Sequence, residues 1–309
     1  MVSKVTAAVI FLGSTLFSFS VHAEPVNSSS PPAAVSVQAT SAQLDLGLTE
    51  ADKPARADNG DVDKLDLKYA KGYLTDAGRL ATSPLRWESN DWLKFGLVIG
   101  GTATLFLVDE KVKDLSQNNQ NSVGKGFASI GNTIGDPLVA FPALGAFYLY
   151  GHLADDSKAR RTSLLALESL TMTGVIASIH KSIASRHRPE SGDGPWAWDG
   201  PSLSSKNVSF CSGHTASAFS IATVFANEYR DNPYVAPVAY GLATFVGMSR
   251  IYSNKHWLSD TFFGGAVGYF TSKAILSYHK KQKDSPLSRF TVRPEISKEM
   301  TGLTVKYAF

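Results

Sequence analysis

A small set of residues, far apart in the 309-residue chain, combines positive side chains with imidazoles and a carboxylate. The set consists of Lys181, Arg188-Pro189, Ser212-Gly213-His214, Ser249-Arg250, His256 and Asp260. The transition state of phosphoryl transfer spreads negative charge over three oxygens, so it needs several positioned cations and N–H donors. The pattern therefore predicts a site that transfers a phosphoryl group without a metal ion.

Five of these residues suit the binding of phosphate oxygens. Arg188 and Arg250 can each offer two parallel N–H donors that match oxyanion geometry, and Lys181 can add a point charge. Ser212 and the backbone N–H of Gly213 stand where a helix is expected to begin, and helix N-termini favour anions. These five are the predicted phosphate ligands.

Two histidines and one aspartate are predicted to carry the reaction. His256 and Asp260 are spaced i and i+4 on one helical face, so the carboxylate could fix the imidazole tautomer and stabilise its cation. A neutral imidazole facing phosphorus is a nucleophile, which predicts a phosphohistidine intermediate. His214 could protonate the leaving oxygen and then activate water. In a competing interpretation the same three residues bind a metal ion, although the three nearby cations disfavour a bare divalent ion.

The elements that must position these residues are helical, because long apolar runs without strand-like alternation follow from about residue 65. Helices are expected at about 90–112, 136–153, 157–185, 215–230, 233–249 and 256–281. Short connections between six helices predict an all-α antiparallel bundle. In such a bundle the end of the third helix, the start of the fourth, the end of the fifth and the start of the sixth share one face. The motifs should therefore meet there.

The two ends of the chain differ from the helical domain expected at residues 62–285. Residues 1–23 have a positive start, an apolar run and a small-residue cleavage site, which predict a secretory signal. Residues 24–61 are rich in Ser, Pro and Ala and predict a disordered spacer. Residues 286–309 contain two β-like runs and predict a hairpin laid against the bundle.

Charge and hydropathy restrict the partners. The formal net charge of +3 implies no broad basic face for nucleic acid. The apolar stretches 95–108 and 137–150 have 14 residues each, fewer than the roughly 20 needed to span a bilayer. We therefore expect core helices in an exported, periplasmic protein, soluble or peripheral on a membrane. An integral membrane protein is the alternative, since small residues at helix interfaces are common in lipid.

The combined pattern resembles the three-part signature of the type 2 phosphatidic acid phosphatase superfamily, which includes bacterial class A acid phosphatases and vanadium haloperoxidases. The resemblance covers about residues 90–280 and implies His256 as nucleophile, His214 as general acid and Asp260 as the residue orienting His256. It implies that no cofactor is needed. It also implies that the phosphate is bound by Lys181, Arg188, Ser212, Gly213 and Arg250. One position departs, because Cys211 stands where the family usually has proline. We expect a packed cysteine there, in a loop of less certain rigidity.

The substrate expected from this resemblance is a phosphate monoester or diphosphate of a lipid, such as phosphatidate, a polyprenyl diphosphate or lipid A. Trp196, Trp198 and Trp257 lie near the motifs and could meet a lipid tail or a membrane surface. They could equally close a small pocket. The alternatives are a soluble periplasmic acid phosphatase that accepts small phosphomonoesters, and a haloperoxidase that holds vanadate in the same site.

Overall fold

The computed structural model describes residues 63–203, 207–283, 290–296 and 301–307. The predicted signal (1–23) and spacer (24–61) lie outside these residues. The described residues form nine α-helices, which confirms the helical prediction. Their bounds are α1 (Leu67–Ala81), α2 (Ser89–Phe106), α3 (Asp109–Asn118), α4 (Ser122–Gly135), α5 (Pro137–Leu153), α6 (Ser157–Ala184), α7 (Gly213–Glu228), α8 (Val235–Tyr252) and α9 (Leu258–Lys283).

The last five predicted helices are confirmed as α5 to α9, with ends that shift by a few residues. The first, predicted over 90–112, is wrong as one helix, because α2 and α3 are bent by 55° at the intervening break. Asp109 begins α3, and its buried carboxylate binds Arg186 and Ser259 in the interior. Helix α4 was not predicted, since its four glycines give it a low helix propensity.

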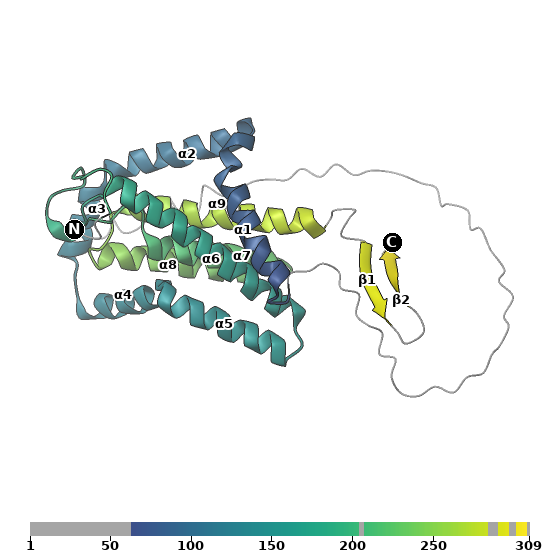
Figure 1. Cartoon of the computed structure of the whole chain (residues 1–309). Helices are drawn as coiled ribbons and strands as arrows, with labels where there is room; N and C mark the ends of the chain where they lie inside the picture. Colours follow the sequence, from purple (N-terminus) through teal and green to yellow (C-terminus); the bar gives the residue numbers. More distant parts are fainter. Residues whose placement is uncertain (1–62, 204–206, 284–289, 297–300, 308–309) are drawn as a thin grey trace, which may run out of the picture. The chain divides into compact units, whose positions relative to one another are not determined.

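Helix α7 lies against α6, α8 and α9, and Figure 1 shows the long helices α6, α8 and α9 running alongside one another. The core between α5, α6, α7 and α9 includes Leu165, Leu170, Val224 and Ile275. Helix α9 approaches α7 closely through glycine: a Cβ added to Gly268 would lie 2.1 Å from a backbone oxygen of α7. This contact holds the start of α9 beside the start of α7.

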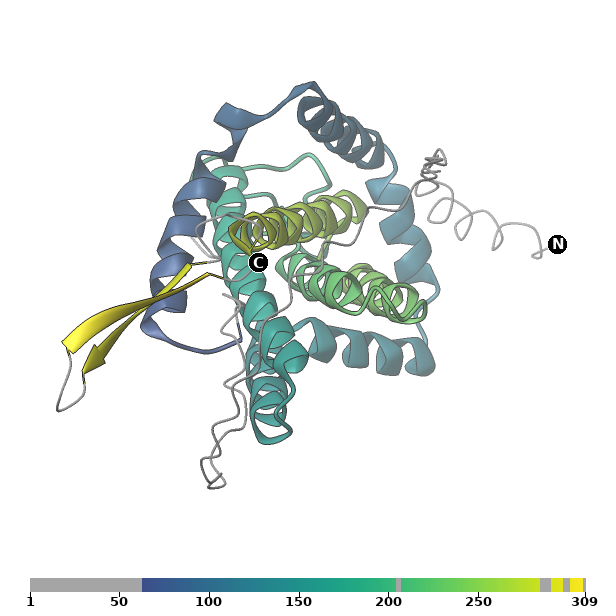
Figure 2. The ribbon, with the colours of Figure 1, turned by 90° about the vertical axis from the view of Figure 1, so that its right-hand side faces the viewer.

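Figure 2 shows several helices around the centre of the bundle, and large apolar side chains are exposed on some of them. The prediction that stretches 95–108 and 137–150 are core is wrong for many of them. Those at least 40% exposed include Phe95, Leu97, Ile99, Leu107, Leu138, Val139, Phe141, Leu149 and Tyr150. The helices α2 and α5 therefore present an apolar outer surface.

One helix of the described chain, α6, is by itself long and apolar enough to cross a membrane. It has 28 residues, and 61% of its most apolar 18-residue stretch is buried. Helices α2 and α3 meet the same criterion only as a bent pair. A buried core helix shares these properties with a membrane span.

Two strands follow the helices. Strand β1 (Phe290–Ile296) pairs antiparallel with β2 (Thr301–Tyr307), with Phe290 opposite Tyr307 and Ile296 opposite Thr301. The predicted packing of this segment against the bundle stays a prediction.

Candidate active site

Four helix ends bring the predicted motifs together. Lys181 lies in the last turn of α6, Arg250 in the last turn of α8, and Asp260 in the first turn of α9. Ser212 is the N-cap of α7, and its backbone N–H donates to the carbonyl oxygen of Asp260 at 3.1 Å. A Cβ added to Gly213 would lie 3.3 Å from the Lys181 Nζ. The structure thus places the start of α7 next to the end of α6 and the start of α9.

Three cations form one side of the site, and part of their hydrogen-bonding capacity is unused. Arg250 donates from Nη1 to Asn132 Oδ1 at 2.8 Å, and Nη1 of Arg188 lies 3.5 Å from Glu190. The Nε–H groups of Arg188 and Arg250 are buried and have no hydrogen-bond partner among the described residues. Burial lowers the pKa of Lys181, and the charges of Arg188 and Arg250 lower it further. An anion among these groups would satisfy the donors and relieve the repulsion.

The tautomer of His256 follows from its hydrogen bond. The ring Nδ1 lies 2.7 Å from the carbonyl oxygen of Ser209. Because a carbonyl only accepts, Nδ1 carries the proton and Nε2 keeps a lone pair in the neutral ring. The side chain is buried, and burial lowers its pKa to about 4. At neutral pH, His256 therefore has the form that a nucleophile requires.

Asp260 does not set this tautomer in the structure, which differs from the prediction. Its Oδ2 lies 3.7 Å from His256 Nδ1, farther than the Ser209 carbonyl. The carboxylate instead accepts from Arg186 Nη1 at 2.6 Å, from the Ser209 hydroxyl at 2.5 Å and from the Trp257 N–H at 2.9 Å. Burial raises the pKa of Asp260, but its contacts with His256 and Arg186 outweigh this and lower it. Its negative charge is thus placed to stabilise a cationic His256 ring.

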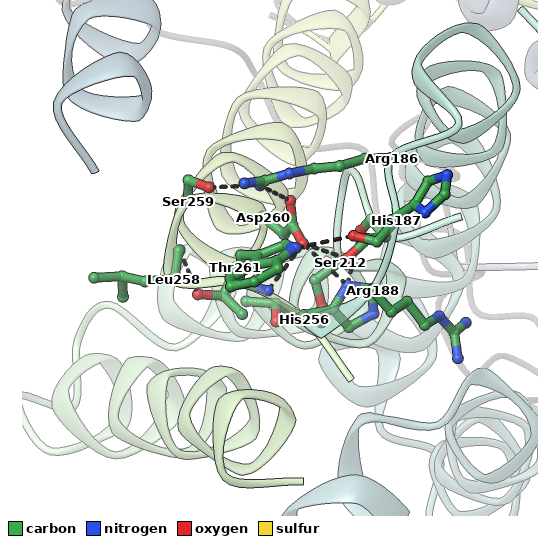
Figure 3. A network of polar contacts seen from close by, with 12 residues as sticks. Arg186, His187, Arg188, Ser212, His256, Leu258, Ser259, Asp260 and Thr261 are labelled. Carbon is green, nitrogen blue, oxygen red and sulfur yellow. Dashed lines mark hydrogen bonds and ion pairs between the residues drawn. The ribbon is translucent and has the colours of Figure 1, made fainter. Parts of the chain in front are cut away.

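Arg186 is the site residue that the sequence interpretation missed. Its side chain is fully buried, between Asp260 at 2.6 Å and Asp109 at 2.8 Å, and it donates to the Ser259 hydroxyl at 2.8 Å. Figure 3 shows Arg186 and Ser259 beside the Asp260 carboxylate. Two features of the sequence could have indicated its role. Arg186 lies two residues before Arg188, and Asp109, its buried partner, directly follows a long apolar run.

His214, in the first turn of α7, also has a lowered pKa. Burial lowers it to about 4, and the charges of Arg250 and His256 contribute. The ring is therefore neutral in the ligand-free site. A phosphate dianion among the neighbouring cations would reverse this effect and favour the protonated ring. His214 could then donate a proton when substrate is bound.

The competing interpretation as a metal site is not supported by the geometry. The oxygens of Asp260 already accept from three groups, and its Oδ2 is directed at Ser209 and Trp257. In the described part of the chain, three acidic or imidazole donors converge elsewhere, at Asp76, Glu168 and His279. The residues His214, His256 and Asp260 do not form such a group.

The cysteine at the departing position is packed, as predicted. Cys211 is buried, beside Ala177 and Phe263. Burial raises the pKa of its thiol to about 12, so the thiol is neutral at physiological pH. It therefore adds no charge to the phosphate site.

The three tryptophans near the motifs differ in exposure. Trp257 is 1% exposed, and its indole N–H donates to the His187 carbonyl at 2.9 Å, so it packs inside and does not face a lipid. Trp196 is 62% exposed and stacks on Phe106, and Trp198 is 38% exposed. These two form an aromatic surface on the loop after η2 (Pro189–Ser191).

Comparison with known proteins agrees with the motifs. Residues 162–284 match the family model of the PAP2 superfamily. This part of the chain contains all the predicted site residues, and the match confirms the predicted resemblance.

Relatives of known name give further context. The chain is 28% identical over 172 residues to the Lipid A 1-phosphatase of Porphyromonas gingivalis, which is 55% of this chain and 35% of that protein. The matched region thus spans about a third of the relative. Among solved structures, Aquifex aeolicus LpxE is 22% identical, with a TM-score of 0.44 over 55% of this chain and 96% of that one. A transmembrane PAP2 type phosphatidylglycerolphosphate phosphatase from Bacillus subtilis is 16% identical, with a TM-score of 0.46 over 70% of this chain and 96% of that one.

Proposed function

We propose that this protein is a metal-independent phosphatase that hydrolyses phosphate monoesters or diphosphates of lipids through a phosphohistidine at His256. The observation that carries the proposal is the pair of buried, unpartnered Nε–H groups of Arg188 and Arg250, beside Lys181. They provide unused donors and positive charge close to a histidine that is neutral and has a free Nε2. The match to the PAP2 superfamily supports the same reaction.

In the first displacement the cations and the Gly213 N–H bind the phosphoryl oxygens. His256 Nε2 attacks phosphorus as the bond to the leaving oxygen breaks. His214, protonated once the phosphate dianion is bound, donates its proton to that oxygen. The positive charge that develops on the His256 ring lies 3.7 Å from Asp260. The Nδ1 proton stays on the ring and is donated to the Ser209 carbonyl throughout.

In the second displacement the now neutral His214 takes a proton from water. The hydroxyl attacks phosphorus, the P–Nε2 bond breaks, and its electron pair returns to the His256 ring. General acid–base assistance of this kind contributes about 10²- to 10⁴-fold. Free phosphate and the neutral nucleophile are regenerated, and the two displacements balance without a redox step.

An apolar groove supports a lipid as the substrate. It has a volume of about 670 Å³ and is lined by α5 and α6 side chains that include Phe141, Val175 and Ile179, and by Leu203. Ser182, which follows Lys181 in the sequence of α6, also lines it, whereas none of the proposed phosphate ligands does. This volume lies within the range of pockets that hold small ligands or part of a lipid chain. We propose that an acyl or isoprenyl chain lies there.

Contact with a membrane is part of the proposal. Many apolar side chains are exposed on α2 and α5, not just one or two on each helix. Apolar surfaces of this kind mark interaction sites. A lipid substrate would reach the groove from the same environment. We propose that the protein works at a membrane surface on the periplasmic side, with the predicted secretory signal directing export.

The test is phosphate release from detergent-solubilised lipid A, phosphatidate, polyprenyl diphosphate and a small aryl phosphate, with and without EDTA. We expect the lipids to be preferred, activity to persist in EDTA, and an acid-labile, base-stable phosphoryl label to form on the protein. His256→Ala should lose both label and activity by at least about 10³-fold. Unchanged turnover in that variant would refute the histidine mechanism. Preference for the aryl phosphate would favour the soluble acid phosphatase.

A further inference from the structure

Three side chains capable of binding a metal ion converge far from the phosphate site. Asp76 of α1, Glu168 of α6 and His279 of α9 place their donor atoms within 4.8 Å of one another. All three side chains are buried, with exposures of 3%, 1% and 5%. Glu168 precedes Lys181 on α6 by a helical distance of roughly 20 Å. The proposed phosphatase reaction uses none of these three residues.

The spacing of the donors suits one small ion. His279 Nε2 lies 2.9 Å from Glu168 Oε2 and 3.5 Å from Asp76 Oδ2. Ligands arranged tetrahedrally around zinc, at about 2.0–2.1 Å from the ion, are roughly 3.3 Å from each other. The observed distances lie on either side of this value. One imidazole and two carboxylates are ligands that Zn²⁺ accepts, with a fourth position left for water.

A second observation points to a ligand at the same place. The Oε1 of Glu168 is buried and has no hydrogen-bond partner among the described residues. Without a metal ion, Asp76 and Glu168 would both accept a hydrogen bond from the Nε2–H of His279. Glu168 Oε1 would then have no partner, which is unfavourable for a buried polar atom. A cation could engage either oxygen of the carboxylate. Arg79 meanwhile binds the other oxygen of Asp76 at 3.1 Å and would orient that ligand from outside.

We propose that Asp76, Glu168 and His279 bind a divalent transition-metal ion, with Zn²⁺ as the probe, and that this ion fastens α1 to α6 and α9. His279 would be neutral in the bound form, with Nε2 on the ion. The site is structural, because it joins three helices distant in sequence and lies away from His256. It goes beyond the proposed phosphatase function and does not depend on it.

The experiment strips the full-length protein with a chelator and titrates it with Zn²⁺. Bound metal is measured by mass spectrometry after gel filtration, and stability by thermal unfolding. We expect about one Zn²⁺ per chain and a Tm increase of about 5 °C or more at 100 times Kd. Glu168→Gln, of nearly the same shape, should lose both the bound ion and the Zn²⁺-dependent shift.

His187→Gln is the matched control, because His187 is a partly exposed histidine that also contacts two aspartates, Asp193 and Asp199, but is not one of the proposed zinc ligands. This variant should keep the bound ion and the Tm shift. No Zn²⁺ above background, or equal Zn²⁺ in Glu168→Gln, would overturn the proposal and indicate that the three side chains only bind one another. If Glu168→Gln does not fold, the wild-type titration decides, since the absence of a Tm shift overturns the proposal.

The phosphatase activity of the metal-stripped protein is measured separately, as phosphate release at a temperature well below its Tm. Retained release together with zinc-dependent stability is the expected result. Loss of release in stripped but folded protein would refute the metal-independent mechanism, and the metal content would still test the zinc site.

Discussion

Replacing Asp260 with Asn separates the charge of this residue from its shape. The carboxylate is fully buried, and its Oδ2 lies 3.7 Å from His256 Nδ1. Asn keeps the volume but removes the negative charge that faces the ring when Nε2 is phosphorylated. The tautomer should not change, because the Nδ1–H group still donates to the Ser209 carbonyl. The variant therefore tests electrostatic stabilisation of the cationic ring alone.

The size of the effect can be worked from the distance. Two unit charges 3.7 Å apart interact by about 4–5 kcal/mol at an effective dielectric constant of about 20. Arg186 binds the same carboxylate at 2.6 Å and offsets part of its charge. If Arg186 offsets about half of this interaction, about 2–3 kcal/mol of transition-state stabilisation depends on the Asp260 charge. Its loss should lower kcat about 10²-fold. We expect KM to change much less, because the charge develops during the reaction.

Asp109→Asn is the matched control. Asp109 binds Arg186 at 2.8 Å and is equally buried, but its other partner is Ser259 instead of His256. Both variants should lose stability, by up to about 3–5 kcal/mol, because each disturbs a buried ion pair. The assay is steady-state kcat on the preferred lipid phosphate at a temperature where both variants remain folded. A similar loss of kcat in both, or no loss in Asp260→Asn, would refute the reasoning.

Two further predictions concern stability. Because burial lowers the pKa of His256 from about 6.5 to about 4, the unfolded chain binds more protons between these pH values, and the free energy of unfolding should fall by roughly 3 kcal/mol as pH drops through this range. Urea denaturation would measure it. His214, whose pKa is also lowered to about 4, adds a similar dependence, so His256→Gln should remove about half of the total; a wild-type stability independent of pH would contradict the burial. A Cβ on Gly264 would lie 2.6 Å from the Ser212 carbonyl oxygen, so Gly264→Ala should cost about 1–3 kcal/mol. Gly241→Ala, with nothing within 4 Å, should be neutral or stabilising by up to about 1 kcal/mol, and equal effects of the two substitutions would show that the close packing of α9 is wrong.

Much of the helical architecture could be predicted because its signals are local. Ser212 caps α7 as expected, and Ser185, just after the end of α6, adopts the left-handed conformation common where helices stop. The order of the helices then predicts which helix ends share a face of the bundle. Lys181, Arg250 and Asp260 could therefore be placed together from the sequence alone. The phosphate site follows from caps and topology.

The partners inside the site could not be predicted, because they depend on long-range packing. Arg186 and Asp109 are 77 residues apart, and nothing in the spacing shows that they meet. The break before Asp109 has the same cause, since its carboxylate is drawn inward by Arg186 and Ser259. Hydropathy likewise marked Leu97 and Leu138 as apolar, but it could not show that both face outward.

The acceptor for His256 Nδ1 is a main-chain carbonyl, and this affects how the site can change in evolution. A substitution replaces side chains, so no single codon change can delete the oxygen of Ser209 that the ring binds. Loss of the Ser209 hydroxyl would remove a partner of Asp260 but would leave the proton of the nucleophile where it is. The backbone thus determines which ring nitrogen of His256 is unprotonated. A point mutation cannot remove this acceptor, whereas it could remove a carboxylate partner.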